Sequence, residues 1–248
     1  MKLHILGCWA PYPRANEACS GYMLEWSGKR ILIDLGHGAF SKLQVISDFR
    51  RLDAVFISHL HPDHCADLSC LRHAVLGEMR AGRDMQPLPL FIPEEPAERY
   101  QQFIGFEDAF SVNTIRLGVE TARAAGLEFR FFATAHPIFT CGVAISDGTS
   151  SFVYTADTGY CSDLVGHAGG ADLILAEASL RGEDAGVAAN VGHLTAGQAG
   201  ELAARAGAHK LVLTHFSPEY DPMLLRQQAE KVFPGDVIPA KEFEIYSF

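Results

Sequence analysis

An eight-residue segment reads S-H-L-H-P-D-H-C and contains four residues that can bind a metal ion, His59, His61, Asp63 and His64. Imidazole nitrogens combined with a carboxylate oxygen suit zinc and related divalent ions. His59 and His61 stand two apart in an extended segment, so both can face one ion. We expect Pro62 to forbid a regular helix through the ligands, so that Asp63 and His64 reach past a turn toward a second ion.

Three further residues of ligand type stand where apolar strands are expected to end. His136 follows F-R-F-F-A-T-A, Asp157 ends S-F-V-Y-T-A-D, and His215 ends K-L-V-L-T-H. The first cluster likewise follows an apolar run, Leu52–Ser58. Because strand ends lead into the loops where functional residues gather, we expect all of these side chains to belong to one loop-built site.

Strand-like and helix-like segments alternate along the chain without a linker, which favours two packed sheets covered by helices. We expect strands at Lys2–Gly7, Gly21–Trp26, Arg30–Asp34, Leu52–Ser58, Leu88–Ile92, Leu127–Ala133, Gly142–Ser146, Ser151–Ala156, Leu173–Glu177, Lys210–Thr214 and Phe243–Tyr246. We expect helices at Leu68–Ala81, Pro96–Ile104, Thr195–Ala206 and Met223–Val232.

Composition is that of a globular enzyme. The chain has 248 residues, of which 48% are hydrophobic, enough for a sizeable core. We expect a single domain, residues 1–248, with two halves at roughly 1–130 and 131–248. No apolar run is long enough for a membrane span and the N-terminus leads straight into strand-like residues, so we expect a cytoplasmic protein without membrane association. The six cysteines form no C-x-x-C pair, and we expect free thiols.

The net charge of −10 disfavours a long nucleic acid as partner, because such affinity comes mainly from Lys and Arg neutralising phosphates. No Lys/Arg run interleaved with aromatic residues occurs in the chain. A small molecule or short phosphodiester is the expected substrate, and a homodimer is a possible assembly.

The motifs resemble the metallo-β-lactamase superfamily, most closely its ribonuclease Z branch, whose fold is a four-layer αββα sandwich of α/β type. The resemblance spans essentially the whole chain. It rests on I-L-I-D-L-G at Ile31–Gly36, H-L-H-P-D-H at His59–His64, H-P-I-F-T-C-G at His136–Gly142, Y-T-A-D-T at Tyr154–Thr158, A-D-L-I-L-A-E-A-S at Ala171–Ser179, G-H-L-T-A-G-Q-A at Gly192–Ala199 and L-T-H-F-S-P-E-Y at Leu213–Tyr220, and on an N-terminal L-G-C before a loop with proline.

The resemblance implies a binuclear site with a bridging hydroxide as nucleophile. Two divalent ions a few ångströms apart need a carboxylate between them to offset their repulsion. Zinc is the expected metal, and the same ligands admit manganese or iron. By resemblance, one ion is held by His59, His61 and His136, the other by Asp63, His64 and His215, and Asp157 bridges them.

His193 matches the proton-donating histidine of the ribonuclease Z branch. It immediately precedes an expected helix whose Thr195 and Gln198 fit a capping box, so N–H groups and a positive dipole end would lie beside its imidazole. Glu177 matches a glutamate of the family and could orient His193. The alternative is that His193 only caps or packs and that Glu177 is a polar strand end.

Other polar residues near the motifs receive weaker assignments. Asp34 ends an apolar strand and is expected to tie a loop together by hydrogen bonds rather than to react. Trp9, Tyr12 and Arg14, on the loop after the first strand, are candidate substrate contacts. The remaining segment, residues 66–130, contains helix and strand signals but no chemistry.

Two departures from ribonuclease Z concern the substrate. The segment between His136 and Asp157 holds two short strands and a turn and leaves no room for the tRNA-binding arm of that family. Glu219 stands where the family has a phosphate-contacting arginine. We therefore expect a metal-dependent phosphodiesterase for a small or short substrate, in which Asp63 orients or deprotonates water and His193 assists the leaving group. The alternatives are hydrolysis of a carboxylic ester, lactone or thioester, or a metal-binding sensor without turnover.

Overall fold

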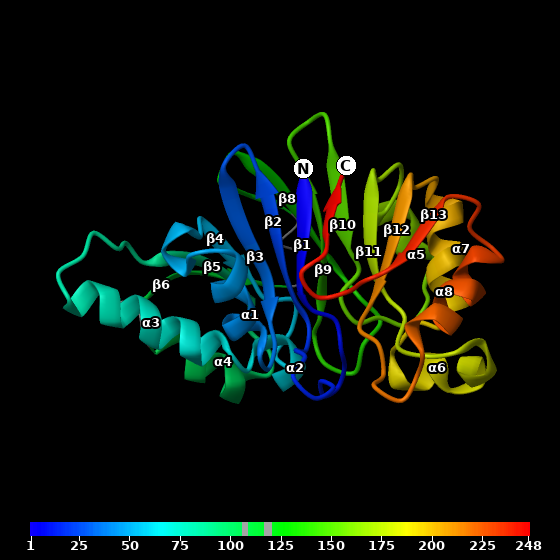
Figure 1. The fold of residues 1–248 in the computed structure, drawn as a ribbon, viewed down its shortest axis with the longest axis horizontal. Coiled ribbons are helices and arrows are strands. Elements are labelled where there is room, and N and C mark those ends of the chain that lie inside the picture. Colours follow the sequence, from blue (N-terminus) through cyan, green and yellow to red (C-terminus); the bar gives the residue numbers. More distant parts are fainter. Residues whose placement is uncertain (106–108, 117–120) are drawn as a thin grey trace.

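Two mixed β-sheets lie face to face with helices outside each of them (Figure 1). The computed structural model describes residues 1–105, 109–116 and 121–248. In spatial order the first sheet runs β14 (Ile245–Ser247), β1 (Lys2–Gly7), β2 (Gly21–Trp26), β3 (Lys29–Leu35), β4 (Ala54–Phe56), β5 (Leu88–Pro93), β6 (Phe110–Ile115). The second runs β13 (Asp236–Pro239), β12 (Lys210–Thr214), β11 (Leu173–Glu177), β10 (Ser151–Tyr154), β9 (Cys141–Ser146), β8 (Leu127–Ala133), β7 (Thr121–Ala124).

Helices form the two outer layers, which confirms the predicted αββα sandwich (Figure 1). Outside the first sheet lie α1 (Ala39–Ile46), α3 (Leu68–Arg80) and α4 (Ala97–Ile104). Outside the second lie α5 (Ser162–His167), α7 (Ala196–Ala206) and α8 (Pro222–Glu230). The short helices α2 (Pro62–Cys65) and α6 (Ala185–Val191) lie at one end of the sandwich, and 3₁₀ turns occur at Phe49–Arg51 and Gly182–Asp184. In the described part of the chain, no helix has the length and apolar character that crossing a bilayer requires.

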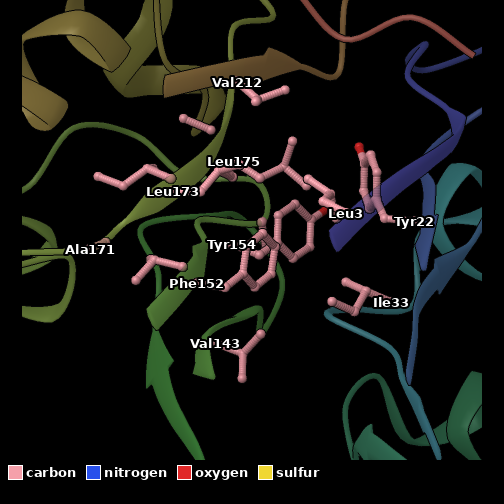
Figure 2. Close-up of a cluster of buried hydrophobic side chains, with 14 of the residues drawn as sticks. Leu3, Tyr22, Ile33, Val143, Phe152, Tyr154, Ala171, Leu173, Leu175 and Val212 are labelled. Atoms are coloured by element: carbon pink, nitrogen blue, oxygen red, sulfur yellow. The ribbon is translucent and has the colours of Figure 1, made fainter. Parts of the chain in front are cut away.

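Strand alternation explains why both faces of the first sheet are buried. Along β3, Ile31 and Ile33 face the second sheet, while Leu32 faces the helical layer. Figure 2 shows the space between the sheets, where side chains such as Tyr22 and Ile33 approach Phe152 and Tyr154 from the opposite sheet. Burying apolar surface of this kind is the main favourable term in folding and fixes how the two halves meet.

Parallel pairing directs several strand ends to the same edge of the sandwich. β3 pairs with β4, and β10, β11 and β12 pair with one another, all in parallel. The carboxyl ends of parallel neighbours therefore open on one side, where loops can assemble a site. An isolated bridge from Trp9 to Phe216 joins the two halves at this edge, and a second bridge links Trp9 to Cys19 within the first half.

Several predicted boundaries differ from the structure. Only Ala54–Phe56 of the expected strand Leu52–Ser58 is paired, because a 3₁₀ turn precedes it and the ligand loop follows. The last strand begins later than predicted, at Ile245, since Phe243 has a φ of 69° that a strand does not accommodate. The chain enters the second sheet at Thr121, before the predicted division near 130, and its C-terminal strand returns to the first sheet. All six cysteines are unpaired, as expected.

Candidate metal centre

The ligand loop follows β4 and turns at Pro62. A one-turn helix, α2, begins there and carries Asp63 and His64. The expectation that proline would exclude helix from this segment is wrong, because proline is tolerated at the first helical position, where its missing N–H has no intrahelical acceptor. His59 and His64 have no exposed surface, and Asp63 is 8% exposed. The loop is thus a buried, fixed part of the fold.

The seven predicted ligand residues lie together in two adjacent groups. Within each group the nitrogen and carboxylate oxygen atoms that could bind an ion lie within 4.8 Å of one another. The groups are His59, His61, His136 and Asp157, and Asp63, His64 and His215. This is the grouping that the resemblance implies, and binding of metal by these residues remains a prediction.

Asp157 stands between the two groups and presents one oxygen to each. Its Oδ1 lies 3.1 Å from His215 Nε2 and 3.3 Å from His64 Nε2. Its Oδ2 lies 3.6 Å from His59 Nε2 and 3.9 Å from His136 Nε2. Oδ1 is buried and has no hydrogen bond of acceptable geometry. Because an unpaired buried carboxylate oxygen is costly, this placement fits an oxygen that bridges two cations.

Four histidines form a hydrogen bond through Nδ1, the ring nitrogen that points away from the centre. The Nε2 atom of each therefore faces the centre. An outer partner of this kind fixes the tautomer and the ring orientation of a metal-binding histidine. The four contacts are His64 Nδ1 to Asp34 Oδ2 at 2.8 Å, His136 Nδ1 to the carbonyl of Gly192 at 2.9 Å, His59 Nδ1 to Ser58 Oγ at 3.1 Å and His215 Nδ1 to Ser179 Oγ at 2.7 Å.

Asp34 holds the ligand loop to the end of β3, which confirms its predicted structural role. It accepts hydrogen bonds from the amide and hydroxyl of Ser58 at 2.7 and 2.8 Å and from the hydroxyl of Tyr154 at 2.7 Å. Two residues later Gly36 packs against the loop, where an added Cβ would lie 1.9 Å from the carbonyl oxygen of Asp63. Only glycine permits so close an approach.

Burial and mutual charge shift the titration of the cluster. Burial lowers the pKa of His59 well below its ordinary value. Burial also lowers the pKa of His215, but the carboxylate of Asp157 outweighs it and raises that pKa to about 10. Burial lowers the pKa of His64 as well, but nearby carboxylates, Asp157 foremost, outweigh burial and raise this pKa well above its ordinary value. Burial raises the pKa of Asp157, but His215 and His64 hold it well below its usual range. The raised pKa values of His64 and His215 therefore favour positive imidazole charge that offsets the neighbouring carboxylates.

His193 lies beside this centre and is held by Glu177. Its Nδ1 is 3.1 and 3.2 Å from the two carboxylate oxygens of Glu177. Its ring contacts those of His136 and His215, with centroids 5.1 and 5.5 Å away. Burial lowers the pKa of His193, but the charge of Glu177 and its hydrogen bond raise it above the ordinary value. His193 could also group with Asp157 and His215 around an ion, so its role needs a separate test.

The segment after His193 forms the predicted capping box. Thr195 is the N-cap of α7, and its hydroxyl accepts a hydrogen bond from the amide of Gln198 at 3.2 Å. The Gln198 side chain accepts in return from the amide of Thr195 at 2.9 Å. This reciprocal pair fixes where the helix starts and so fixes the backbone that carries His193.

Glu177 is buried and fully engaged, which favours an orienting role over that of a polar strand end. Besides His193, it accepts a hydrogen bond from the amide of Thr158 at 2.6 Å and one from the hydroxyl of Ser179 at 2.5 Å. Thr158 directly follows Asp157, so Glu177 also fixes the loop that carries the bridging carboxylate. A single carboxylate thus supports both the histidine and the candidate bridge.

Three hydroxyl groups at the site were not singled out from the sequence. Ser58, Tyr154 and Ser179 each hydrogen-bond a carboxylate or a candidate ligand, as described above. Ser58 and Ser179 stand in or next to the quoted motifs, and that neighbourhood was the available signal. Tyr154 begins the motif Y-T-A-D-T, but its contact with Asp34 could not be foreseen, because it reaches Asp34 from the opposite sheet.

A cavity of about 590 Å³ opens onto the centre and exposes part of both groups to solvent. Polar groups of Asp63, Asp157, His193 and His215 form one part of its lining. The rest of the lining is Ala10, Pro11, His61, Pro62, Ser179, Leu180, Ser217 and Tyr220. A second cavity of about 550 Å³, lined in part by Arg116, Arg130 and His167, contains none of the seven ligand residues.

The loop after β1 forms a wall of the site, but its predicted contact residues face other protein groups. Arg14 lies over the ring of Trp9 at 4.0 Å and donates to the carbonyl oxygens of Pro218 and Tyr220. Tyr12 donates to Glu219 at 2.9 Å. Ala10 and Pro11 of this loop line the cavity instead. These side chains therefore join two loops, and their contact with a substrate stays a prediction.

The donor set suits divalent metal ions. Five imidazoles and two carboxylates converge, the outer nitrogens of four imidazoles are already bonded, and a buried oxygen of Asp157 lacks a partner. Nitrogen and oxygen donors in this ratio are typical of zinc, manganese or iron sites. These residues would hold two ions, one at each group.

Comparison with known proteins agrees with the fold. A family model described as "Beta-lactamase superfamily domain" matches residues 29–216. The chain is 32% identical over 244 residues to a probable metallo-hydrolase, YhfI, of Bacillus subtilis (strain 168), and the match covers 97% of both chains. The crystal structure of YhfI superposes with a TM-score of 0.93 at 31% identity, covering 99% of this chain and 98% of that one.

A more distant relative differs in length. Ribonuclease Z of Nocardia farcinica (strain IFM 10152) is 25% identical, with 97% of this chain and 95% of the relative covered. That alignment extends over 298 positions, although this chain has only 248 residues. The ribonuclease Z therefore contains segments that this chain lacks.

Proposed function

The chain belongs to the beta-lactamase superfamily, as a metallo-hydrolase, and from that premise we propose that it is a phosphodiesterase for a small or short phosphodiester. Two divalent ions, when bound, would polarise a phosphoryl oxygen and make water acidic enough to supply a nucleophile. The expected metal is zinc, held by the two groups of ligands.

The observation that carries the proposal is the pair formed by His193 and Glu177 at the edge of the metal centre. The pKa of His193 is raised despite its burial, because Glu177 favours the charged imidazole. A histidine whose charged form is favoured in this way can protonate a leaving alkoxide, which is the poor leaving group of a phosphodiester. Its Nδ1 faces Glu177, which leaves Nε2 to give the proton.

Asp63 would act on the opposite side of the reaction. It lines the cavity, and its Oδ2 lies 3.5 Å from His215 Nε2 and 3.6 Å from His64 Nε2. Burial raises the pKa of Asp63, but His64 and His215 outweigh it, so that this carboxyl is ionised. An ionised carboxylate facing the cavity can orient a water molecule and accept its proton.

Three features support a small or short substrate. The cavity of about 590 Å³ has the size of a pocket for a small molecule. Between His136 and Asp157 the chain contains only β9, β10 and their turn, which leaves no arm to grip tRNA. Glu219 stands at the position where the resemblance to ribonuclease Z would place a phosphate-contacting arginine. Its carboxylate accepts a hydrogen bond from Tyr12 instead.

Metal analysis followed by a parallel substrate panel tests the proposal. The panel contains cyclic nucleotides, aryl phosphodiesters, pre-tRNA, lactones and thioesters, each at matched concentration with the metal-loaded protein. We expect turnover of aryl phosphodiesters and cyclic nucleotides and little cleavage of pre-tRNA. Preferred hydrolysis of a lactone or thioester would contradict the proposal and would favour the alternative, a hydrolase of carboxylic esters, lactones or thioesters. Two bound ions without turnover of any substrate would favour a sensor.

A further inference from the structure

Ser179 occupies a position between the candidate metal ligand His215 and the carboxylate of Glu177. Its hydroxyl oxygen lies 2.5 Å from Glu177 Oε2 and 2.7 Å from His215 Nδ1. The side chain is 9% exposed and faces the cavity. One hydroxyl group therefore touches both the metal centre and the pair proposed to donate the proton.

The chemistry of the three groups determines the direction of both hydrogen bonds. A carboxylate can only accept, so the hydroxyl proton of Ser179 points to Glu177. The hydroxyl has lone pairs left for His215, whose Nδ1 must then carry hydrogen and donate. His215 consequently presents Nε2 to the centre, where it lies 3.1 Å from Asp157 Oδ1. The orientation of a metal-facing nitrogen thus depends on this hydroxyl.

The pairing of β11 with β12 explains the proximity. Glu177 and Thr214 are direct partners in this parallel ladder. Their strands end together, so Ser179 and His215 leave the same sheet edge side by side. The amide of Ala178 also donates to the carbonyl of Thr214 at 2.8 Å, which extends the pairing one step past the strands. The contact between Ser179 and His215 is therefore built on rigid elements.

The same arrangement occurs in the first half of the molecule. Ser58 donates to Asp34 at 2.8 Å while its oxygen lies 3.1 Å from His59 Nδ1. Asp34 in turn holds His64, as Glu177 holds His193. Each half thus places a strand-end serine between a buried carboxylate and a candidate ligand.

From this geometry we infer that Ser179 is a positioning residue that orients His215 for the ion held with Asp63 and His64, and orients Glu177 for His193. This inference rests on the proposed metal-dependent function. Outer partners of metal-binding histidines commonly contribute about 10- to 100-fold in metal affinity or activity. Removal of the Ser179 hydroxyl also deprives Glu177 of a hydrogen-bond donor, and Glu177 holds His193. Ser179 therefore couples metal affinity to proton donation.

The first measurement is metal affinity, which needs no substrate. Metal-free protein is titrated with Zn²⁺ against a chromogenic chelator. We expect Ser179→Ala to bind one of its two ions about 10- to 100-fold more weakly than the wild type, with the other ion little affected. Ser179→Thr keeps the hydroxyl and is expected to bind nearly as tightly as the wild type. Ser217→Ala, which removes another cavity hydroxyl that contacts none of the ligands, is the matched control for affinity.

The second measurement separates positioning from packing. On aryl phosphodiesters, Ser179→Ala should lose more kcat as the leaving group becomes poorer, because His193 is less well held. In a His193→Ala background that leaving-group dependence should disappear, while the loss of metal affinity from Ser179→Ala should persist.

Two outcomes would refute the inference, and a third would contradict the proposed function on which it rests. Wild-type affinity in Ser179→Ala refutes the positioning role. An equal loss in Ser179→Thr also refutes it, because then the hydroxyl group is not what matters. A wild-type protein that binds no metal contradicts the proposed function itself, and the titration distinguishes that failure from the other two.

Discussion

Asp63 and Asp157 are chemically identical residues with different environments. Asp157 is 2% exposed, and its carboxylate lies against imidazoles of both groups. Asp63 touches only the second group and borders the cavity. These environments favour Asp157 for the proposed bridging role and Asp63 for the proposed role that involves water.

Replacing Asp63 tests this division. Asp63→Ala should leave the fold intact but reduce kcat about 100-fold or more, because a positioned acid or base contributes that much and one metal ligand is also lost. Steady-state rates on an aryl phosphodiester and circular dichroism provide the measurements. Asp84→Ala, a surface aspartate outside the site, serves as control. Undiminished turnover in Asp63→Ala would sink the mechanism.

The raised pKa values of His64 and His215 predict how metal affinity changes with pH. A group with a raised pKa keeps its proton at neutral pH, and that proton must leave before the nitrogen can bind an ion. Affinity should therefore rise with pH from about 6.5, the usual value for histidine, up to the value of about 10 for His215. Uptake of metal near neutral pH should therefore release protons.

Calorimetric titration of the metal-free protein in buffers of different ionisation enthalpy measures that proton release. The observed heat should vary with the buffer in proportion to the protons released. Equal heats in every buffer would mean that His64 and His215 are already neutral before metal binds. The description of these histidines as ion-paired with carboxylates would then be wrong.

At the scale of residues, the sequence singled out the candidate ligands but not the groups that support them. The seven ligand types are readable because four share one loop and each of the other three ends an apolar strand. Ser179 and Ser58 lacked such a signal, because a serine has no rare chemistry of its own. The contacts of Arg14 could not be predicted either, because the carbonyl groups it binds belong to Pro218 and Tyr220, about two hundred residues away in the chain.

At the scale of elements, α7 supports the site through its first turn. Its capping box could be recognised from sequence because it is local, with Thr195 and Gln198 three residues apart. His193 stands two residues before the N-cap, so fraying of this turn would loosen the imidazole. The helix end thus connects local sequence to the geometry of His193, the proposed proton donor.

Thr195→Ala measures that connection. Loss of an N-cap side chain costs about 1 kcal/mol, which for a chain of this size lowers the Tm by roughly 2–4 °C. Thr195→Ser keeps the hydroxyl and should recover most of the loss in thermal unfolding. A Thr195→Ala protein with an unchanged Tm would show that packing of α7, rather than its cap, fixes this end.

The strands that escaped prediction are edge strands, and the short helices α1, α2, α5 and α6 were not expected either. In the described part of the chain, β6, β7 and β13 were not expected, and each lies at or near the end of a sheet. Their burial is partial; β6, for example, alternates exposed and half-buried positions along its length. An edge strand pairs on one side only, so its sequence needs no apolar run. The central strands, buried on both faces, were recognised for the opposite reason.

At the scale of the whole molecule, buried hydroxyl groups join the two sheets at the site. Tyr154 of the second sheet donates to Asp34 of the first at 2.7 Å, and Tyr22 of the first lies 2.8 Å from the hydroxyl of Thr214 in the second. The rings of Tyr22 and Tyr154 are 5.3 Å apart (Figure 2). These contacts fix the distance between the ligands of one half and those of the other.

Tyr154→Phe removes the hydroxyl and keeps the ring. Since a hydrogen bond to a charged group contributes about 1.5–3 kcal/mol, we expect the free energy of unfolding to fall by that amount in urea titrations. Tyr12→Phe removes a tyrosine hydroxyl bonded to Glu219 at the surface, and should cost far less. Equal costs for the two variants would argue that the bond to Asp34 is not special.

Metal removal acts on the same interface between halves. His59, His61, Asp63 and His64 come from the first half and the other three ligands from the second, so bound ions would crosslink the halves. An ion present at 100 times its Kd stabilises the folded chain by about 2.7 kcal/mol. Chelation should therefore lower the Tm by roughly 5–10 °C. Asp157→Ala, which lacks the bridge, should show a much smaller chelator effect in the same thermal scan. If chelator shifted both proteins equally, the ions would not be joining the halves through this carboxylate.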